Sequence, residues 1–214
     1  MTSALPVGRP RRFGDAEERQ LIMDGAMAVM ARTGYVEAPL GDILSEAGVS
    51  TRAFYRHFAT RDALLLALYR RDADRVGRRL RDSTDAVADP VKALEAWVDG
   101  VLDLFHEPRR ARRVAILGSP AIRRADGFDA EFDHGLSALA APLSDAIRRG
   151  VEAGSFRSDD PPIDAAIIVA TALEAVRLFP RHREDARTLI LRFALGALGA
   201  SGGPIRRRRS AAVR

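Results

Sequence analysis

Residues 40–61 constrain the fold more strongly than any other part of this 214-residue chain. This stretch reads LGDILSEAGVSTRAFYRHFATR and contains two short helical patterns separated by a tight turn. The first pattern has apolar residues at the i, i+3, i+4, i+7 spacing of one helix face: Leu40, Ile43, Leu44 and Ala47. Gly48 follows, and glycine adopts without strain the left-handed conformation that ends many helices. The pattern therefore predicts a first helix that ends at a glycine turn.

A second helix is predicted directly after this turn. The hydroxyl of Ser50 can cap the free amides of the new helix. Phe54 and Phe58 lie one turn apart and share its apolar side, which leaves the polar residues between them for other faces. Two short helices joined by a turn of three or four residues that contains glycine form a helix-turn-helix.

The charge pattern of this stretch favours duplex DNA as its partner. Between Ala47 and Arg61 there is no acidic residue, as approach to a dense line of phosphates requires. The second helix of a helix-turn-helix enters the major groove, and its first turn meets the base edges. Thr51 and Arg52 occupy that turn, and Arg can bond both O6 and N7 of guanine.

Other side chains of the stretch are predicted to hold phosphates rather than bases. Tyr55, His57 and Arg61 are placed for such contacts, which fix register without reading sequence. Thr60 is expected to cap the next helix, whose positive end also attracts phosphate. The full set of predicted DNA-binding residues is Ser50, Thr51, Arg52, Tyr55, Arg56, His57 and Arg61.

Residues 19–65 resemble the DNA-binding domain of the TetR family of bacterial one-component transcriptional regulators. The residues that carry the resemblance are Ile22, Ala26, Gly34-Tyr35, Ile43, Ala47-Gly48-Val49-Ser50, Phe54-Tyr55, His57-Phe58, Arg61 and Leu64-Leu65. Ala38 stands where the family usually has Thr, and Arg61 stands where Lys is usual. The run is far more specific than a bare helix-turn-helix.

The resemblance implies an all-α protein with two domains. We expect an N-terminal three-helix helix-turn-helix domain in residues 15–60, and a larger helical ligand-binding and dimerisation domain in residues 61–200 (about nine helices). Residues 1–14 are expected to form a flexible basic arm, and residues 201–214 a basic disordered tail. At the start of the first helix, Asp15 and Glu18 have the spacing of a capping box.

The implied function is sequence-specific transcriptional regulation. We expect a repressor that responds to a small, largely apolar effector and binds an inverted-repeat operator as a homodimer. Two broad-faced apolar helices near the end of the chain fit a four-helix dimer interface, with burial inside one monomer as the alternative. The predicted interface residues are Ile167, Thr171, Glu174, Leu178, Leu189, Arg192, Phe193 and Gly196.

Aromatic and apolar residues at helical spacing are candidates for the effector pocket, although the same pattern is typical of a plain core. The candidates are Trp97, Val101, Phe105, Phe128, Phe132 and His134. Glu131 and His134 form one Glu-x-x-His, whereas a di-iron bundle site needs that motif twice with two further Glu residues. No metal site and no cofactor are therefore predicted.

Composition excludes several other classes of protein. The chain has no Cys, so disulfides, thiolate zinc sites and a Cys nucleophile are excluded. No apolar run reaches the ~18 residues of a membrane span, and no secretory signal is present, so we expect a cytoplasmic protein. No P-loop, G-x-S-x-G or dinucleotide-binding motif occurs, so an enzyme is not expected.

The formal net charge of +5 comes from the end of the chain rather than from the predicted folded domains. Residues 201–214 contain five Arg and no acid, so the rest of the chain is formally neutral. The basic arm and tail could touch DNA or stay in solvent. Two alternatives to a ligand-responsive repressor stay open: a constitutive or architectural DNA-binding dimer without ligand, and an all-helical enzyme.

Overall fold

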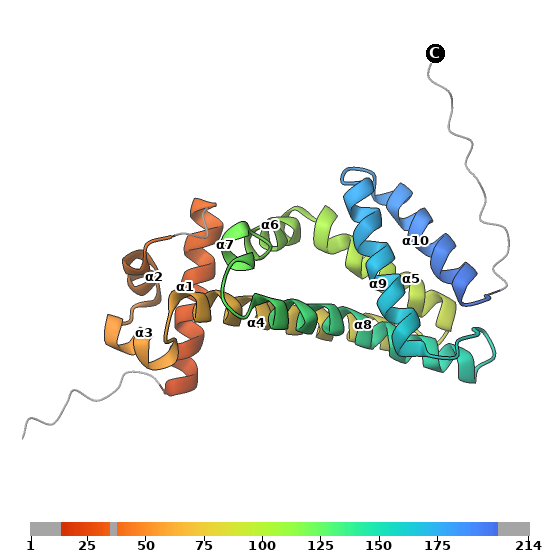
Figure 1. Ribbon diagram of the computed structural model, residues 1–214, viewed down its shortest axis with the longest axis horizontal. Helices are drawn as coiled ribbons and strands as arrows, with labels where there is room; N and C mark the ends of the chain where they lie inside the picture. The colour runs from red at the N-terminus through yellow and green to blue at the C-terminus, as the bar shows by residue number, and fades with distance from the viewer. Residues whose placement is uncertain (1–13, 35–37, 201–214) are drawn as a thin grey trace, which may run out of the picture. The chain divides into compact units, whose positions relative to one another are not determined.

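The computed structural model describes residues 14–34 and 38–200, and over these ranges the chain is entirely helical. Ten helices are present in them, one of which, α7, is a single turn (Figure 1). Their bounds are α1 Asp15–Thr33, α2 Leu40–Ala47, α3 Thr51–His57, α4 Arg61–Asp85, α5 Pro90–His106, α6 Pro108–Leu117, α7 Pro120–Arg123, α8 Phe128–Glu152, α9 Pro161–Leu178 and α10 Arg183–Ala197. The all-α prediction is confirmed. The predictions for the basic arm and tail fall outside the described residues, apart from Gly14.

Contacts divide the chain into two compact units. The head unit consists of Met1–Tyr69 and Ala115–Asp129, and the body unit of Arg70–Val114 and Ala130–Arg214. The head unit is larger than the expected segment 15–60, because residues 61–69 and 115–129 pack into the same core. The functional division at residue 60 stays a prediction.

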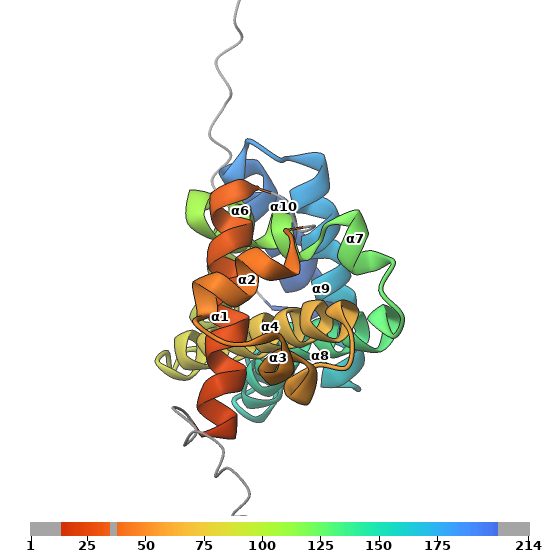
Figure 2. The same ribbon diagram turned by 90° about the vertical axis from the view of Figure 1, so that its left-hand side faces the viewer.

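In the head unit, α1 lies against both α2 and α3 (Figures 1 and 2). The crossing with α2 is close because Gly25 of α1 has no side chain. A Cβ on Gly25 would lie 3.0 Å from the backbone nitrogen of Ala47. The core of the unit includes Ile22, Phe54 and Leu64, which come from α1, α3 and α4. The core therefore fixes α3, the predicted DNA-reading helix, on the head unit.

In the body unit, α5, α9 and α10 pack side by side (Figure 1). Their contact surfaces form one hydrophobic core around the fully buried Trp97 of α5. Ala172 of α9 and Ala194 of α10 are buried in the same core. Small buried residues let helix axes approach closely, so these three helices form one packed bundle.

The parts of α4 and α8 that belong to the body unit also approach closely. Gly77 of α4 faces Ala138 of α8, where an added Cβ would lie 2.9 Å from the Ala138 carbonyl oxygen. Arg81 and Asp145 form an ion pair across the two helices at 2.6 Å. Pro142 lies inside α8, where it removes a backbone donor from the helix.

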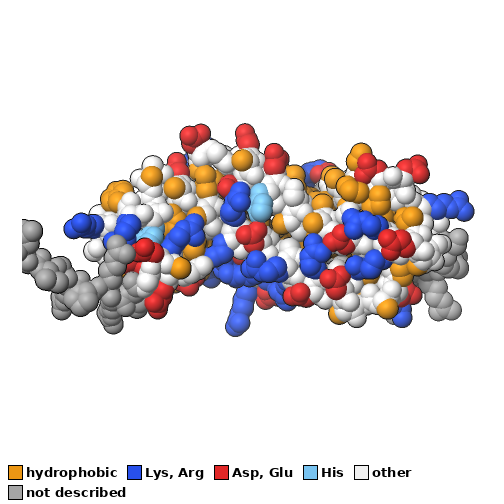
Figure 3. Space-filling model, turned by 90° about the horizontal axis from the view of Figure 1, so that it is seen from below, with side chains coloured by type: hydrophobic (Ala, Val, Ile, Leu, Met, Phe, Trp, Pro, Cys, Tyr) orange, Lys and Arg blue, Asp and Glu red, His pale blue; other side chains and the backbone are white. Residues whose placement is uncertain are grey.

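The helices of the described residues lack a membrane-spanning stretch, and the face drawn in Figure 3 carries charges of both signs. None of the helices in residues 14–34 and 38–200 is long and apolar enough to cross a bilayer. On the face shown in Figure 3, Lys and Arg side chains are intermixed with Asp and Glu side chains.

Candidate nucleic-acid interface

The turn between α2 and α3 has the geometry that the sequence predicts. Gly48 adopts the left-handed conformation with φ 65°, which ends α2. Ser50 then caps α3, because its Oγ accepts a hydrogen bond from the backbone N–H of Ala53 at 3.2 Å. The predicted helix-turn-helix is confirmed, and the hydroxyl of Ser50 is used within it.

The packing of α3 determines which of its residues face solvent. Phe54 and Phe58 are buried in the head core, with their ring centroids 5.7 Å apart. Thr51, Arg52 and Tyr55 are all exposed, and Tyr55 is 58% exposed. The outward face of α3 therefore carries a hydroxyl, a guanidinium and a phenol without a carboxylate on the same helix.

The first turn of α4 supplies the third part of the predicted interface. Thr60 caps this helix as expected, because its Oγ1 accepts a hydrogen bond from the N–H of Ala63 at 3.1 Å. Arg61 is the first residue of α4 and is half-buried. Asp62 is exposed beside it, so a phosphate at this helix end would also meet one carboxylate.

Arg56 and His57, at the end of α3, already have a partner on α1, and their predicted DNA-binding roles stay predictions. The Glu18 carboxylate of α1 forms an ion pair with the Arg56 guanidinium. His57 Nε2 lies 2.7 Å from Glu18 Oε2, and the His57 side chain is only 8% exposed. Both residues therefore bind a carboxylate of α1, and the Arg56 side chain remains 32% exposed.

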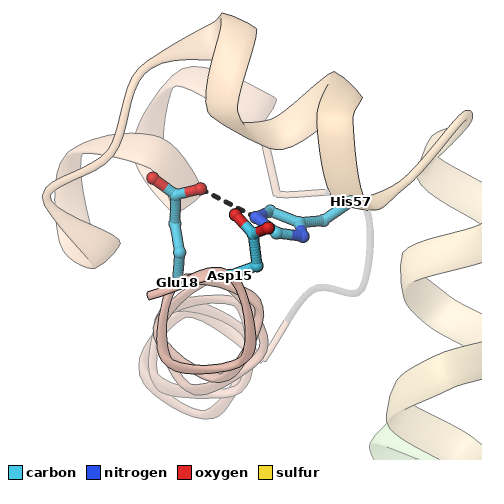
Figure 4. Close-up of side chains that lie close together, drawn as sticks. All are labelled: Asp15, Glu18 and His57. Carbon is cyan, nitrogen blue, oxygen red and sulfur yellow. Dashed lines mark hydrogen bonds and ion pairs between the residues drawn. The ribbon is translucent and has the colours of Figure 1, made fainter. Parts of the chain in front are cut away.

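This contact also corrects the expected start of α1. Gly14 occupies the N-cap position and no side chain caps the helix, so the predicted capping box is wrong. Glu18 turns instead toward α3, and its side chain is 13% exposed (Figure 4). Burial raises the pKa of Glu18, but its bonds with His57 and Arg56 outweigh burial and hold that pKa below its usual value.

Asp15, Glu18 and His57 also resemble a set of metal ligands, since one potential ligand atom of each lies within 4.8 Å of the others (Figure 4). The Arg56 guanidinium, however, already binds Glu18, and its Nε lies 3.9 Å from Asp15 Oδ1. A metal ion there would face this fixed positive charge. The arrangement is that of an ion-pair cluster. The sequence carries no local signal for it, because Glu18 and His57 are 39 residues apart.

The six predicted pocket residues have different surroundings in the structure. Trp97 and Val101 are buried in the body core, and Trp97 Nε1 donates a hydrogen bond to the Leu139 carbonyl at 3.0 Å. Phe105 packs against the same core. Phe128 packs in the head core, 5.4 Å from the Tyr69 ring, and Phe132 is 43% exposed. Their role in ligand binding stays a prediction.

His134, the sixth of these residues, lines an open groove of about 350 Å³ between α4 and α8. His134 Nε2 lies 2.7 Å from Asp74 Oδ1, and Arg78 and Arg81 line the groove beside them. The groove is thus lined by several charged groups, whereas the effector expected from the sequence is largely apolar. Sequence periodicity does not reveal this groove, since its lining mixes charged residues with Gly, Ala and Pro from two helices that are distant in sequence.

The predicted dimer residues lie on the outer side of α9 and α10. Ile167 is 58% exposed and Phe193 is 55% exposed, although both are large apolar residues. Six of the eight predicted residues are exposed, while Thr171 and Leu189 are half-buried: Ile167, Thr171, Glu174, Leu178, Leu189, Arg192, Phe193 and Gly196. Exposed Ile163 continues the same apolar stripe along α9.

Comparison with known proteins agrees with this architecture. Residues 22–68 match the family model "Bacterial regulatory proteins, tetR family". The chain is 28% identical over 150 residues to the HTH-type transcriptional repressor Rv1474c of Mycobacterium tuberculosis, covering 68% of this chain and 73% of that protein.

Solved structures share the fold at lower identity. The transcriptional regulator FadR from Bacillus subtilis in complex with stearoyl-CoA superposes with a TM-score of 0.64 at 17% identity, over 83% of this chain and 98% of that chain. RolR in complex with resorcinol superposes with a TM-score of 0.62 at 19% identity, over 87% and 90% of the two chains. At these identities the likeness concerns the fold.

Proposed function

Since this chain belongs to the TetR family of DNA-binding transcriptional regulators, we propose that it represses transcription as a homodimer on an inverted-repeat operator. We further propose that a small, largely apolar effector releases it from that operator. The family is one of regulators rather than enzymes, and the similar M. tuberculosis protein is a repressor. Each part of the proposal has its own support in the chain.

The observation that carries the proposal is the outward face of α3. Thr51 and Arg52 lie in its first turn, which in a docked helix-turn-helix meets the base edges of the major groove. A guanidinium bonded to guanine O6 and N7 discriminates that base by ~1–3 kcal/mol. Tyr55 and Arg61 are proposed to hold phosphates on either side of this helix.

Homodimerisation is supported by the exposed apolar stripe of α9 and α10. Ile163, Ile167 and Leu178 are each more than half exposed on α9, and Phe193 on α10 adds a large ring. A second copy related by two-fold symmetry would cover this stripe with the same stripe of its own. Two recognition helices in such a dimer would meet major grooves one helical turn apart, ~34 Å, or a multiple of that distance.

The effector part of the proposal is supported by the fold relatives and by the size of the body unit. One relative binds stearoyl-CoA and another binds resorcinol, so this architecture accommodates ligands that differ greatly in size. A ligand that binds one spacing of the two heads better than another shifts the population toward that spacing. Differential affinity of ~1–3 kcal/mol is the usual range for such coupling.

The proposal is tested by fluorescence anisotropy of the full chain on the duplex upstream of its own gene, with a random duplex as control. We expect specific binding at least ~10³ times tighter than random binding. Arg52→Ala should weaken binding to the specific duplex by ~1–3 kcal/mol of binding free energy, because the contact with one base pair is lost. Equal loss on specific and random DNA for Arg52→Ala would assign that residue to the phosphates instead.

Two matched variants separate phosphate contacts from base contacts. Tyr55→Phe and Arg61→Ala should weaken binding to all duplexes alike, and Arg61→Ala should also flatten the salt dependence. Specific binding that no small apolar compound releases in a screen would favour the alternative of a constitutive DNA-binding dimer. Higher reporter expression after deletion of the gene is expected for a repressor, and lower expression for an activator.

A further inference from the structure

The contact between Glu18 and the end of α3 joins two parts of the head that are distant in sequence. Glu18 lies in the first turn of α1, whereas Arg56 and His57 are the last two residues of α3. The Glu18 carboxylate binds both side chains, and Figure 4 shows its contact with His57. Asp15 adds a second carboxylate 3.9 Å from Arg56 Nε. We refer to these four residues as the clasp.

We propose that Glu18 is a positioning residue for DNA recognition, because it holds the end of α3 on α1 and withdraws Arg56 and His57 from phosphate binding. This inference rests on the proposed function, since it concerns how that function reads DNA. It changes the set of residues that would neutralise phosphates: Arg61 and Tyr55 remain in the set, and Arg56 and His57 leave it.

A helix as short as α3 needs such external support. It has seven residues, and isolated helices of that length are not stable in water. Ser50 caps its first turn, and Phe54 and Phe58 bury its inner face. The clasp fixes the last turn, so a rotation of α3 that would move Thr51 and Arg52 off their bases must first break it.

The charges of the clasp explain why an anion is tolerated at this place. The C-terminal end of a helix carries a partial negative charge, which repels a carboxylate and attracts cations. Arg56 and His57 are the basic residues of that last turn, and both contact the Glu18 carboxylate. The lowered pKa of Glu18 agrees with a carboxylate that stays ionised between these partners.

Glu18 and a DNA phosphate would compete for the same guanidinium. The Arg56 side chain is 32% exposed and Glu18 is 13% exposed, so the existing pair is partly shielded from salt. A phosphate would have to break this pair before it could bind Arg56. Arg56 therefore should not contribute to the counterion release that gives DNA binding its salt dependence.

The salt slope of binding to a random 30-base-pair duplex distinguishes the two roles of Arg56. Arg56→Ala in the otherwise unchanged full chain should leave the slope of log K against log[salt] unchanged. Glu18→Gln should free Arg56 for one phosphate and steepen the slope by about 0.9. The double variant Glu18→Gln with Arg56→Ala should return to the original slope. A role of Glu18 in stability alone would not produce this pattern.

Glu17→Gln is the matched control, because Glu17 is exposed in the same turn of α1 and loses the same charge. It should change the slope much less than Glu18→Gln does. On the duplex upstream of the gene, Glu18→Gln should also reduce discrimination against random DNA by about 5- to 150-fold, the value of one misplaced base contact. Glu17→Gln should leave that discrimination unchanged.

Several results would overturn the inference. A slope flattened by about 0.9 in Arg56→Ala alone would show that Arg56 binds a phosphate directly. This variant keeps the inference testable if Glu18→Gln does not fold. Stoichiometric Zn²⁺ binding to the unaltered chain that Glu18→Gln abolishes would show a metal site instead. If the unaltered chain binds neither duplex, the proposed function itself fails; if it binds and the slopes of all variants are equal, only the clasp fails.

Discussion

The ring of Phe156 packs directly onto the backbone of Gly150 in the body unit. A Cβ at Gly150 would lie 2.1 Å from Phe156 Cδ2, a distance that no real contact allows. The backbone N–H of Phe156 also donates a hydrogen bond to the Gly150 carbonyl at 3.1 Å. The chain after α8 therefore folds back onto the helix at a position where any side chain would require the Phe156 ring to move.

We expect Gly150→Ala to destabilise the body unit despite the higher helix propensity of Ala. Propensity gains roughly 1 kcal/mol, whereas overpacking a buried ring costs about 1–3 kcal/mol. Differential scanning calorimetry should show a lower Tm. Gly41→Ala is the control, because nothing lies within 4 Å of its added Cβ, and it should stabilise the head. An unchanged or higher Tm for Gly150→Ala would show that Phe156 can move aside freely.

The helix ends were the part of this fold most open to prediction from sequence. Ser50, Thr60 and Asp89 each cap a helix within three residues of themselves, so their signals are local. Gly48 has positive φ as its position predicts, and Gly34 has positive φ at the end of α1. Such signals depend on residues close together in the chain, and tertiary packing overrode them only at the start of α1, where Glu18 binds His57 instead of capping the helix.

Contacts between distant helices were not predictable in the same way. The clasp depends on the rotation of α3 against α1, and no spacing rule relates Glu18 to His57. For Trp97 the sequence pattern leaves two structures open, because its helical spacing fits both a ligand pocket and a hydrophobic core. In the structure, Trp97 is buried in the core. Periodicity indicates that a side chain points inward, but it does not indicate what lies there.

The ion pair between Arg81 and Asp145 should make the stability of the body unit depend on acid. Burial raises the pKa of Asp145, but its bonds with Arg81 and Arg148 outweigh burial and lower that pKa below its usual value. The stabilisation is thus present above the unfolded-state pKa of about 3.9 and is lost as pH falls through the lower folded pKa.

We therefore expect Asp145→Asn to lower the free energy of unfolding at pH 7 and to lose this effect progressively below about pH 4. Urea unfolding at several pH values between 7 and 2 measures the difference. Asp133→Asn is the control, since Asp133 is exposed on the same helix. A difference between Asp145→Asn and the unaltered chain that does not shrink with acid would argue against the ion pair.

A second group of ion pairs joins α10 to α5. Arg187 donates from Nε to Asp99 Oδ1 at 2.9 Å and from Nη2 to Asp99 Oδ2 at 3.2 Å. Arg183 also donates to Asp99, at 3.1 Å, and to Asp103 at 3.2 Å. Arg187→Lys keeps the charge but cannot form this forked pair. We expect a loss of up to about 1 kcal/mol, since the groups are partly exposed.

The measurement is thermal unfolding of Arg187→Lys at low salt and in 1 M NaCl. The difference in Tm from the unaltered chain should be smaller in 1 M NaCl, because the Debye length there is only ~3 Å and exposed ion pairs are screened. Arg181→Lys provides the comparison, because Arg181 is exposed just before α10. Equal Tm values for the two variants would show that the forked geometry contributes nothing measurable.

The exposed stripe of α9 and α10 gives the most direct test of the homodimer. Phe193→Asp removes an exposed ring from α10 and places a charge on the stripe. Because two-fold symmetry repeats each substitution, the loss of two buried side chains at ~1.5–3 kcal/mol each raises the dissociation constant more than about 100-fold. Ile167→Asp, at the same stripe on α9, should have the same effect.

Light scattering after size exclusion should then give twice the 23.3 kDa of one chain for the unaltered protein and one chain mass for Phe193→Asp. Val151→Asp is the matched control, since Val151 is an exposed apolar residue of α8 outside the stripe. That variant should remain a dimer. Because the two half-sites of an operator are bound together, Phe193→Asp should also lose specific DNA affinity while its head unit stays folded. A dimer that survives both Phe193→Asp and Ile167→Asp would place the interface on another surface.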